Sequence, residues 1–336
     1  MSSDNKYSAA LPTPICAPTR LVVPRRVRAR CWRQRLGDSA GSDRPSDRGA
    51  ALDSLRITAA ANQSKSWLDP TDHTRGEGLS HSGRAAAADR DLTWFVRRHV
   101  QPSRHPEFLA DSGFVVVTFN HTQDSGSASK DEVDNISSFL VRPTDTKRVI
   151  SYVLSARQTR LAVDARRVGL FGFSRGGYTG LVLAGAVPNF RAPLFPCPEE
   201  FRMCKQMRDD NIPEHDSGYD PRIKAFVIAD PISLFPDKAS LRQVKAPIQL
   251  WSSERGGMGV RPEDVESVER NLPTAPEFHR PAHSVHFSFL FPCTDEETKV
   301  MSFQCTDAPD FNRADFHKTL NAQMLEFFRK NLAIKR

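Results

Sequence analysis

The sequence of 336 residues lacks any apolar run long enough to cross a membrane, since a spanning helix needs about 20 predominantly apolar residues. The segment Met1 to Tyr7 is polar, so we expect no secretory signal there. No Cys-x-x-Cys pair occurs among the six cysteines, which argues against a zinc site. We therefore expect neither a membrane span nor a metal, and a cytoplasmic location by default.

Four of the cysteines form two pairs that are close in sequence and lie in loop-like stretches, namely Cys197 with Cys204 and Cys293 with Cys305. Two local disulfides at these positions would suit an exported protein, whereas free thiols would suit the cytosol. The sequence leaves both alternatives open.

The excess of positive charge is confined to the N-terminal third. Residues 1–105 hold 18 Lys and Arg residues against 10 Asp and Glu, whereas the remainder holds 29 against 30. Apolar residues in this third follow no sustained period, so we expect a basic region of low order at 1–105. An Arg-rich arm can contact phosphates, but aromatic residues are sparse and no nucleic-acid motif is present, so a nucleic-acid partner is not favoured.

Residues 106–336 alternate between short apolar runs and amphipathic stretches, which predicts a single α/β domain with a mostly parallel sheet covered by helices on both faces. The expected strands are Phe114–Phe119, Val168–Phe171, Ala225–Ala229, Pro247–Trp251 and Glu277–Arg280. The expected helices are Asp145–Ala156, Pro262–Asn271 and Asn312–Leu332.

The segment Gly172-Phe-Ser-Arg-Gly176 follows one of these strands and precedes a helix rich in small residues. A G-x-S-x-G sequence in that context is typical of a nucleophile elbow, in which a sharp turn exposes the serine hydroxyl. The flanking glycines permit the close approach of strand and helix. Ser174 is thus the expected nucleophile. The backbone amide of Arg175, at the positive end of the helix, is the expected oxyanion-hole donor.

A serine nucleophile needs a histidine base and an acid that orients it, in the chain order Ser, Asp or Glu, His. His286 follows the last expected strand, so we favour it over His283 and over His317 in the C-terminal helix. For the acid we favour Asp230, directly after the strand Ala225–Ala229. The alternatives are Glu254, after the next strand, and Asp264.

Four segments carry a family resemblance: Leu109–Val117 running into Asn120-His121, the elbow Gly172–Gly177, Ile228–Pro231 and Ser284–Phe287. Over about two-thirds of its length the chain resembles the α/β-hydrolase fold. More narrowly, it is similar to the bacterial predicted dienelactone hydrolases, relatives of the platelet-activating-factor acetylhydrolases. The resemblance implies Asp230 as the acid and His286 as the base. The true dienelactone enzymes use a cysteine nucleophile, whereas this chain has Ser174.

The chain departs from these families at two places. Many relatives carry an Asp where Met258 stands here. The relatives also have an apolar strand ending in His-Gly-x-Gly, which supplies a second oxyanion donor and lies between the strands equivalent to Phe114–Phe119 and Val168–Phe171. Leu79–Gly83 is only a faint echo of it. The candidates to fill this slot are Leu21–Val23, Leu55–Ala59 and Trp94–Val96.

We therefore expect a carboxylic ester hydrolase that uses Ser174, His286 and Asp230, needs no cofactor, and is slowed if the oxyanion loop is incomplete. The expected partner is a small-molecule ester. The alternatives are a non-catalytic remnant of the fold that acts as a binding module, and nucleic-acid binding by residues 1–105.

Overall fold

The computed structural model describes residues 20–22, 56–59, 105–121, 123–124, 128–155, 163–191, 197, 201–214 and 218–333. Its strands are β1 (Arg20–Val22), β2 (Arg56–Ala59), β3 (Val115–Thr118), β4 (Val168–Phe173), β5 (Ile223–Ala229), β6 (Ile248–Trp251) and β7 (Glu277–His279). Its longer helices are α1 (His105–Asp111), α3 (Ser137–Ser155), α5 (Arg175–Ala184), α6 (Arg202–Arg208), α8 (Pro262–Asn271) and α11 (Arg313–Asn331). The shorter ones are α2 (Lys130–Val133), α7 (Lys238–Leu241), α9 (Asp295–Val300), α10 (Ser302–Cys305) and the 3₁₀ helix η1 (His286–Phe289).

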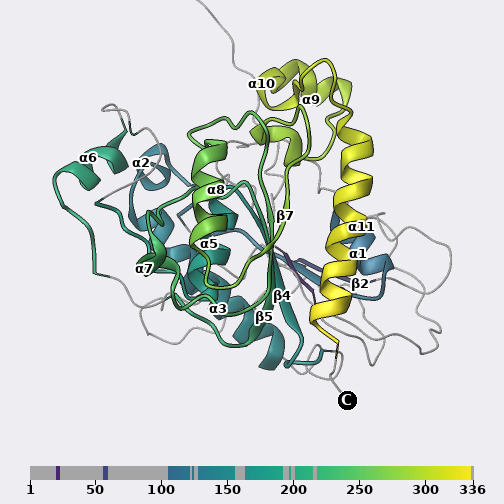
Figure 1. The fold of residues 1–336 in the computed structure, drawn as a ribbon, viewed down its shortest axis with the longest axis horizontal. Helices are drawn as coiled ribbons and strands as arrows, with labels where there is room; N and C mark the ends of the chain where they lie inside the picture. The colour runs from purple at the N-terminus through teal and green to yellow at the C-terminus, as the bar shows by residue number, and fades with distance from the viewer. Residues whose placement is uncertain are drawn as a thin grey trace, which may run out of the picture.

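The strands form a mixed sheet arrangement with helices on both faces. β4, β5, β6 and β7 are parallel and adjacent in that order, while β1 and β2 pair antiparallel with the two edges of β3. Figure 1 shows α3, α5 and α8 on one side of the sheet and α1 and α11 on the other. The predicted α/β class, with its parallel sheet between helical layers, is confirmed.

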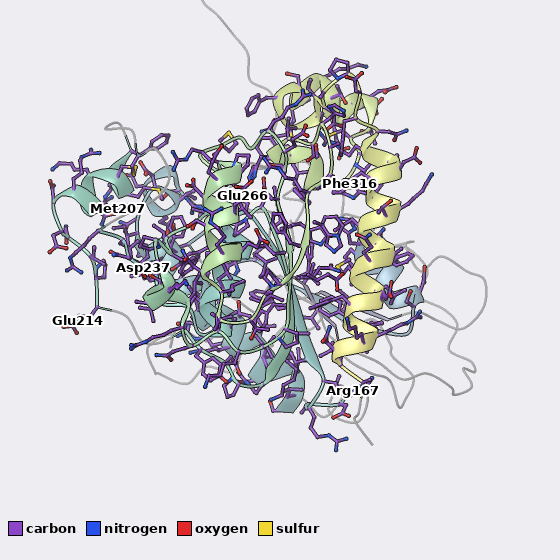
Figure 2. All side chains as sticks on the ribbon, viewed as in Figure 1. Arg167, Met207, Glu214, Asp237, Glu266 and Phe316 are labelled. Carbon is purple, nitrogen blue, oxygen red and sulfur yellow. A yellow bond between two sulfur atoms is a disulfide. The ribbon has the colours of Figure 1, made fainter. Side chains whose placement is uncertain are left out.

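The parallel strands β4, β5 and β6 are largely buried because helices cover both of their faces. All six residues of β4 and all four of β6 are buried. On one face, Phe316 of α11, labelled in Figure 2, packs inward. Its ring centroid lies 6.0 Å from that of Trp251 of β6. Arg167, just before β4, donates to the carbonyl of Leu332 and so ties the end of α11 to the sheet.

The five predicted strands lie where the sequence placed them, with ends shifted by at most a few residues. The prediction for the first helix was wrong at its start, because α3 begins at Ser137 rather than Asp145 and contains Pro143. The proline forgoes one backbone hydrogen bond. The helix nevertheless continues on the N-terminal side of the proline, because Phe139 and Arg142 are buried there, at 1% and 0% exposed.

The N-terminal third contributes two strands to the described structure. β1 pairs with β3 and also contacts β4, so it lies in the slot between them for which Leu21–Val23 was a candidate. β2, which overlaps the candidate Leu55–Ala59, pairs with the opposite edge of β3. Trp94–Val96, Leu79–Gly83 and the arginine clusters lie outside the described residues, so the low order expected for 1–105 and the domain boundary after residue 105 stay predictions.

Both cysteine pairs are disulfide-bonded, Cys197 to Cys204 and Cys293 to Cys305. The second bond links the loop before α9 to the last residue of α10. Among the helices of the described residues, none is both long and apolar enough to cross a membrane.

A substitution at Gly180 can test how closely α5 packs on the sheet. A Cβ at Gly180 would lie 2.4 Å from Cδ1 of Ile228 and 2.9 Å from Cδ2 of Leu170. In an exposed helix, Gly→Ala stabilises by about 1 kcal/mol, but overpacking costs about 1–3 kcal/mol. We expect Gly180→Ala to lower the free energy of unfolding in a urea titration. Ala322→Gly, at an exposed position of α11, measures the propensity effect alone. A Gly180→Ala variant as stable as the parent would contradict the close packing.

Candidate active site

Ser174 lies on a strained turn between β4 and α5. Its φ of 55° and ψ of −115° are unusual for a residue with a side chain. The turn is tight, since a Cβ at Gly172 would lie 2.1 Å from the carbonyl oxygen of Gly176. The amide of Ser174 donates to the carbonyl of Ala229 at 3.0 Å, which fixes the turn to the end of β5. The half-buried Ser174 side chain is thus held in one place at the carboxyl edge of the sheet.

His286 lies between Ser174 and Asp230. Its Nε2 is 3.1 Å from Oγ of Ser174, and its Nδ1 is 2.8 Å from Oδ2 of Asp230. The imidazole is 3% exposed and the carboxylate is fully buried. These three favoured residues therefore meet, although 56 residues separate each from the next along the chain.

Asp230 is held by β6 and the residues that follow it. Its backbone amide donates to the carbonyl of Trp251 at 2.8 Å. Its carboxylate accepts from both the amide and the hydroxyl of Ser253, each at 2.7 Å. Ser253 was missed by the sequence analysis, and its only signal was its place just after a strand that neighbours β5. Three donors and a fully buried position fix the orientation of the carboxylate.

His286 is positioned by a glycine-rich turn and by a ring. Its amide donates to the carbonyl of Gly256 at 2.8 Å, and its imidazole lies 4.7 Å from the ring of Phe173. The next residue of the turn, Gly257, has a φ of 136°, and a Cβ there would lie 3.2 Å from Cβ of His286. Met258, where many members of the resembling families carry Asp, also adopts a positive φ of 51°.

The alternative acids lie elsewhere. Glu254 accepts from the amide of His283 at 2.8 Å, and its side chain is 40% exposed. Asp264 forms an ion pair with Arg261 at the start of α8. Among the carboxylates of the described residues, that of Asp230 contacts the imidazole of His286.

The competing histidines make other contacts. His283 is partly exposed and lies near Arg255 and Glu254. His317 is buried in α11, where it stacks on His105 at 4.6 Å and its Nε2 lies 2.9 Å from the carbonyl of Ser288. His215 lies outside the described residues. Within the part of the chain that the structure describes, no group of three His, Cys, Asp or Glu residues could hold a metal ion.

Arg175 is the first residue of α5, so its amide belongs to the helix turn whose N–H groups point out of the N-terminus. That turn starts directly after Ser174. The Arg175 side chain does not extend into solvent but is 2% exposed. The role of its amide stays a prediction.

No protein-family model matches the chain, and no curated protein sequence matches it. Among solved structures, the chain is similar to a ferulic acid esterase from Streptomyces cinnamoneus, with a TM-score of 0.46 and 17% identity. The match covers 76% of this chain and 69% of the esterase. At this TM-score the similarity does not by itself define an activity for the chain.

The tightness of the turn at Gly172 can be tested by measuring protein stability. Gly172→Ala places a methyl group against backbone atoms of Gly176 rather than against movable side-chain ends. We expect the unfolding free energy to fall by about 3 kcal/mol or more, a larger loss than for Gly180→Ala. Chemical denaturation followed by circular dichroism measures both. Equal stability of Gly172→Ala and the parent would show that the turn is not built this tightly.

Proposed function

We propose that the protein is a serine hydrolase of carboxylic esters with an α/β-hydrolase-type site. The observation that carries this proposal is the run of contacts from Ser174 Oγ through the imidazole of His286 to Asp230, at 3.1 Å and 2.8 Å. Both distances lie in or near the range in which a base can take a proton from a hydroxyl. The strained turn at Ser174 adds support, because such strain concentrates at functional sites.

In the proposed reaction, Nε2 of His286 takes the hydroxyl proton of Ser174 while Oγ forms a bond to the ester carbonyl carbon. The carbonyl oxygen gains the negative charge, and the amide of Arg175 donates to it. The tetrahedral species then expels the alcohol, which takes the proton from His286 and leaves an acyl group on Ser174. A water molecule repeats the sequence, with His286 again as base, and releases the acid.

The imidazolium formed in each step is stabilised by Asp230. Its buried carboxylate accepts from Nδ1 of His286 and keeps the ring in the tautomer that presents a lone pair on Nε2 to Ser174. The two hydrogen bonds from Ser253 hold the carboxylate in the plane that this requires. No cofactor takes part in the proposed reaction.

The proposed site has one oxyanion donor, the amide of Arg175. In the resembling families a second donor follows the strand between the equivalents of β3 and β4, and β1 lies in that slot. A site with one donor rather than two is expected to turn over about 10²–10³-fold more slowly. If the site proves inert, the non-catalytic binding module becomes the better description. Nucleic-acid binding would involve residues outside those described.

The first test is hydrolysis of p-nitrophenyl acetate by the purified chain and by Ser174→Ala. We expect turnover that falls by about 10⁴-fold or more in the variant, because the nucleophile is removed. A fluorophosphonate probe should label the parent at Ser174 and leave the variant unlabelled, as read by mass spectrometry. A folded parent that neither hydrolyses the ester nor takes the label would sink the proposal and leave the binding module.

The assignment of the acid has its own test. Asp230→Asn should lower kcat by about 10⁴-fold, because an amide no longer fixes the imidazole tautomer. Glu254→Gln, a matched carboxylate-to-amide change after the neighbouring strand, should leave kcat within about twofold. Thermal melts establish that both variants are folded. The reverse order of effects would assign the role to Glu254.

A further inference from the structure

A buried cluster of charges surrounds the guanidinium of Arg175. The carboxylate of Asp124, in the loop after β3, contacts Nη1 of Arg142 on α3 and lies 3.3 Å from Nη1 of Arg175 on α5. The side chains of Asp124 and Arg142 are fully buried, and that of Arg175 is 2% exposed. Three elements therefore meet around one carboxylate oxygen.

The guanidinium of Arg175 is held from further directions. Its Nη1 donates to Oγ of Ser138 at 2.9 Å, and its Cζ lies 4.4 Å from the ring centroid of Phe139. Ser138 and Phe139 both belong to the first turn of α3. The guanidinium of Arg175 is therefore held by Asp124, Ser138 and Phe139 together.

A second connection reaches the backbone of the same residue. Nε of Arg142 donates to Oγ1 of Thr179 at 2.9 Å, and the Thr179 hydroxyl donates to the carbonyl of Arg175 at 2.9 Å. Arg142 thus acts on Arg175 twice, through the shared carboxylate of Asp124 and through Thr179. Side chain and carbonyl of Arg175 are held by the same cluster, which restricts the position of this residue at the start of α5.

Burying the charges of this cluster has a cost in stability. Burial raises the pKa of the Asp124 carboxyl, and the nearby guanidinium of Arg175 acts in the opposite direction. Burial likewise lowers the pKa of Arg175, opposed by Asp124. Buried ion pairs are often no more stabilising than apolar side chains of similar volume, and some are retained because they fix one geometry.

We infer that Asp124, Arg142 and Thr179 are positioning residues that aim the amide of Arg175 at the oxyanion. This inference rests on the proposed function, since it concerns the donor of that site. The amide of Arg175 adjoins the strained peptide of Ser174, so a small rotation there would turn its N–H away from the developing charge.

Two variants of the full chain test the inference. Arg175→Met keeps the amide and most of the buried volume but removes the anchored guanidinium. Thr179→Val is isosteric and removes the hydroxyl that joins Nε of Arg142 to the carbonyl of Arg175. For p-nitrophenyl acetate we expect kcat to fall about 10–100-fold in Arg175→Met and about 3–10-fold in Thr179→Val, with KM within about twofold of the parent. These losses stay below those expected when a donor is removed outright.

A thionoester supplies the readout that a merely structural role would not change. Its thiocarbonyl sulfur accepts hydrogen bonds weakly, so a misaimed amide should cost the thionoester much less than the oxygen ester. The pH dependence of kcat should stay that of the parent. Within the described residues, the side chain of His286 bonds to Asp230 and Ser174 and not to a member of the cluster. Arg166→Met, which breaks an exposed pair with Asp164, is the matched control and should leave all rates unchanged.

The outcomes separate the two proposals. Equal losses for both esters, or a change in KM as large as that in kcat, would make the cluster a structural support and overturn the inference, as would parental rates in folded variants. Should Arg175→Met fail to fold, Thr179→Val decides. A parent that hydrolyses no ester and takes no fluorophosphonate label overturns the proposed function, and the inference with it.

Discussion

The close approach of α5 to the carboxyl ends of β4 and β5 is the constraint on which the rest of the candidate site depends. At Gly177, an added Cβ would lie 2.8 Å from Cβ of Pro231. Ser174 is also bonded to β5 and to the loop that follows it, since its amide donates to the carbonyl of Ala229 in β5 and its carbonyl accepts from the amide of Ile232 in the loop. The serine and the loop that carries Asp230 are therefore one backbone unit, and neither can shift alone.

The parallel order of β4 to β7 does the remaining assembly. Parallel strands present their carboxyl ends at one edge of the sheet, so the turn after β4, the carboxylate after β5 and the serine after β6 meet there. The loop after β7 then needs only to cross this edge for His286 to lie between Ser174 and Asp230. The geometry of the site follows from topology, and hydrogen bonds to Ser253 and Gly256 set its final orientation.

The site residues that directly follow a strand could be predicted from the sequence. Period and turn chemistry located β4 to β7, and the chain order of the elbow, Asp230 and His286 then indicated which side chains meet. What the sequence could not show depends on packing between distant segments. The first turns of α3 were missed because the burial of Phe139 outweighs the local signal of Pro143. The cluster around Asp124 was missed because its members come from three elements and share no motif.

Two buried guanidiniums share one carboxylate oxygen, so evolutionary substitutions at the three positions constrain one another. A change at Asp124 alone leaves two positive charges facing each other in the interior, and a change at Arg142 also releases Thr179. Homologous chains should therefore replace Asp124, Arg142 and Arg175 as a set, and intermediates with one replacement should be rare. Covariation among these three positions would therefore reflect the need to keep the buried charges balanced.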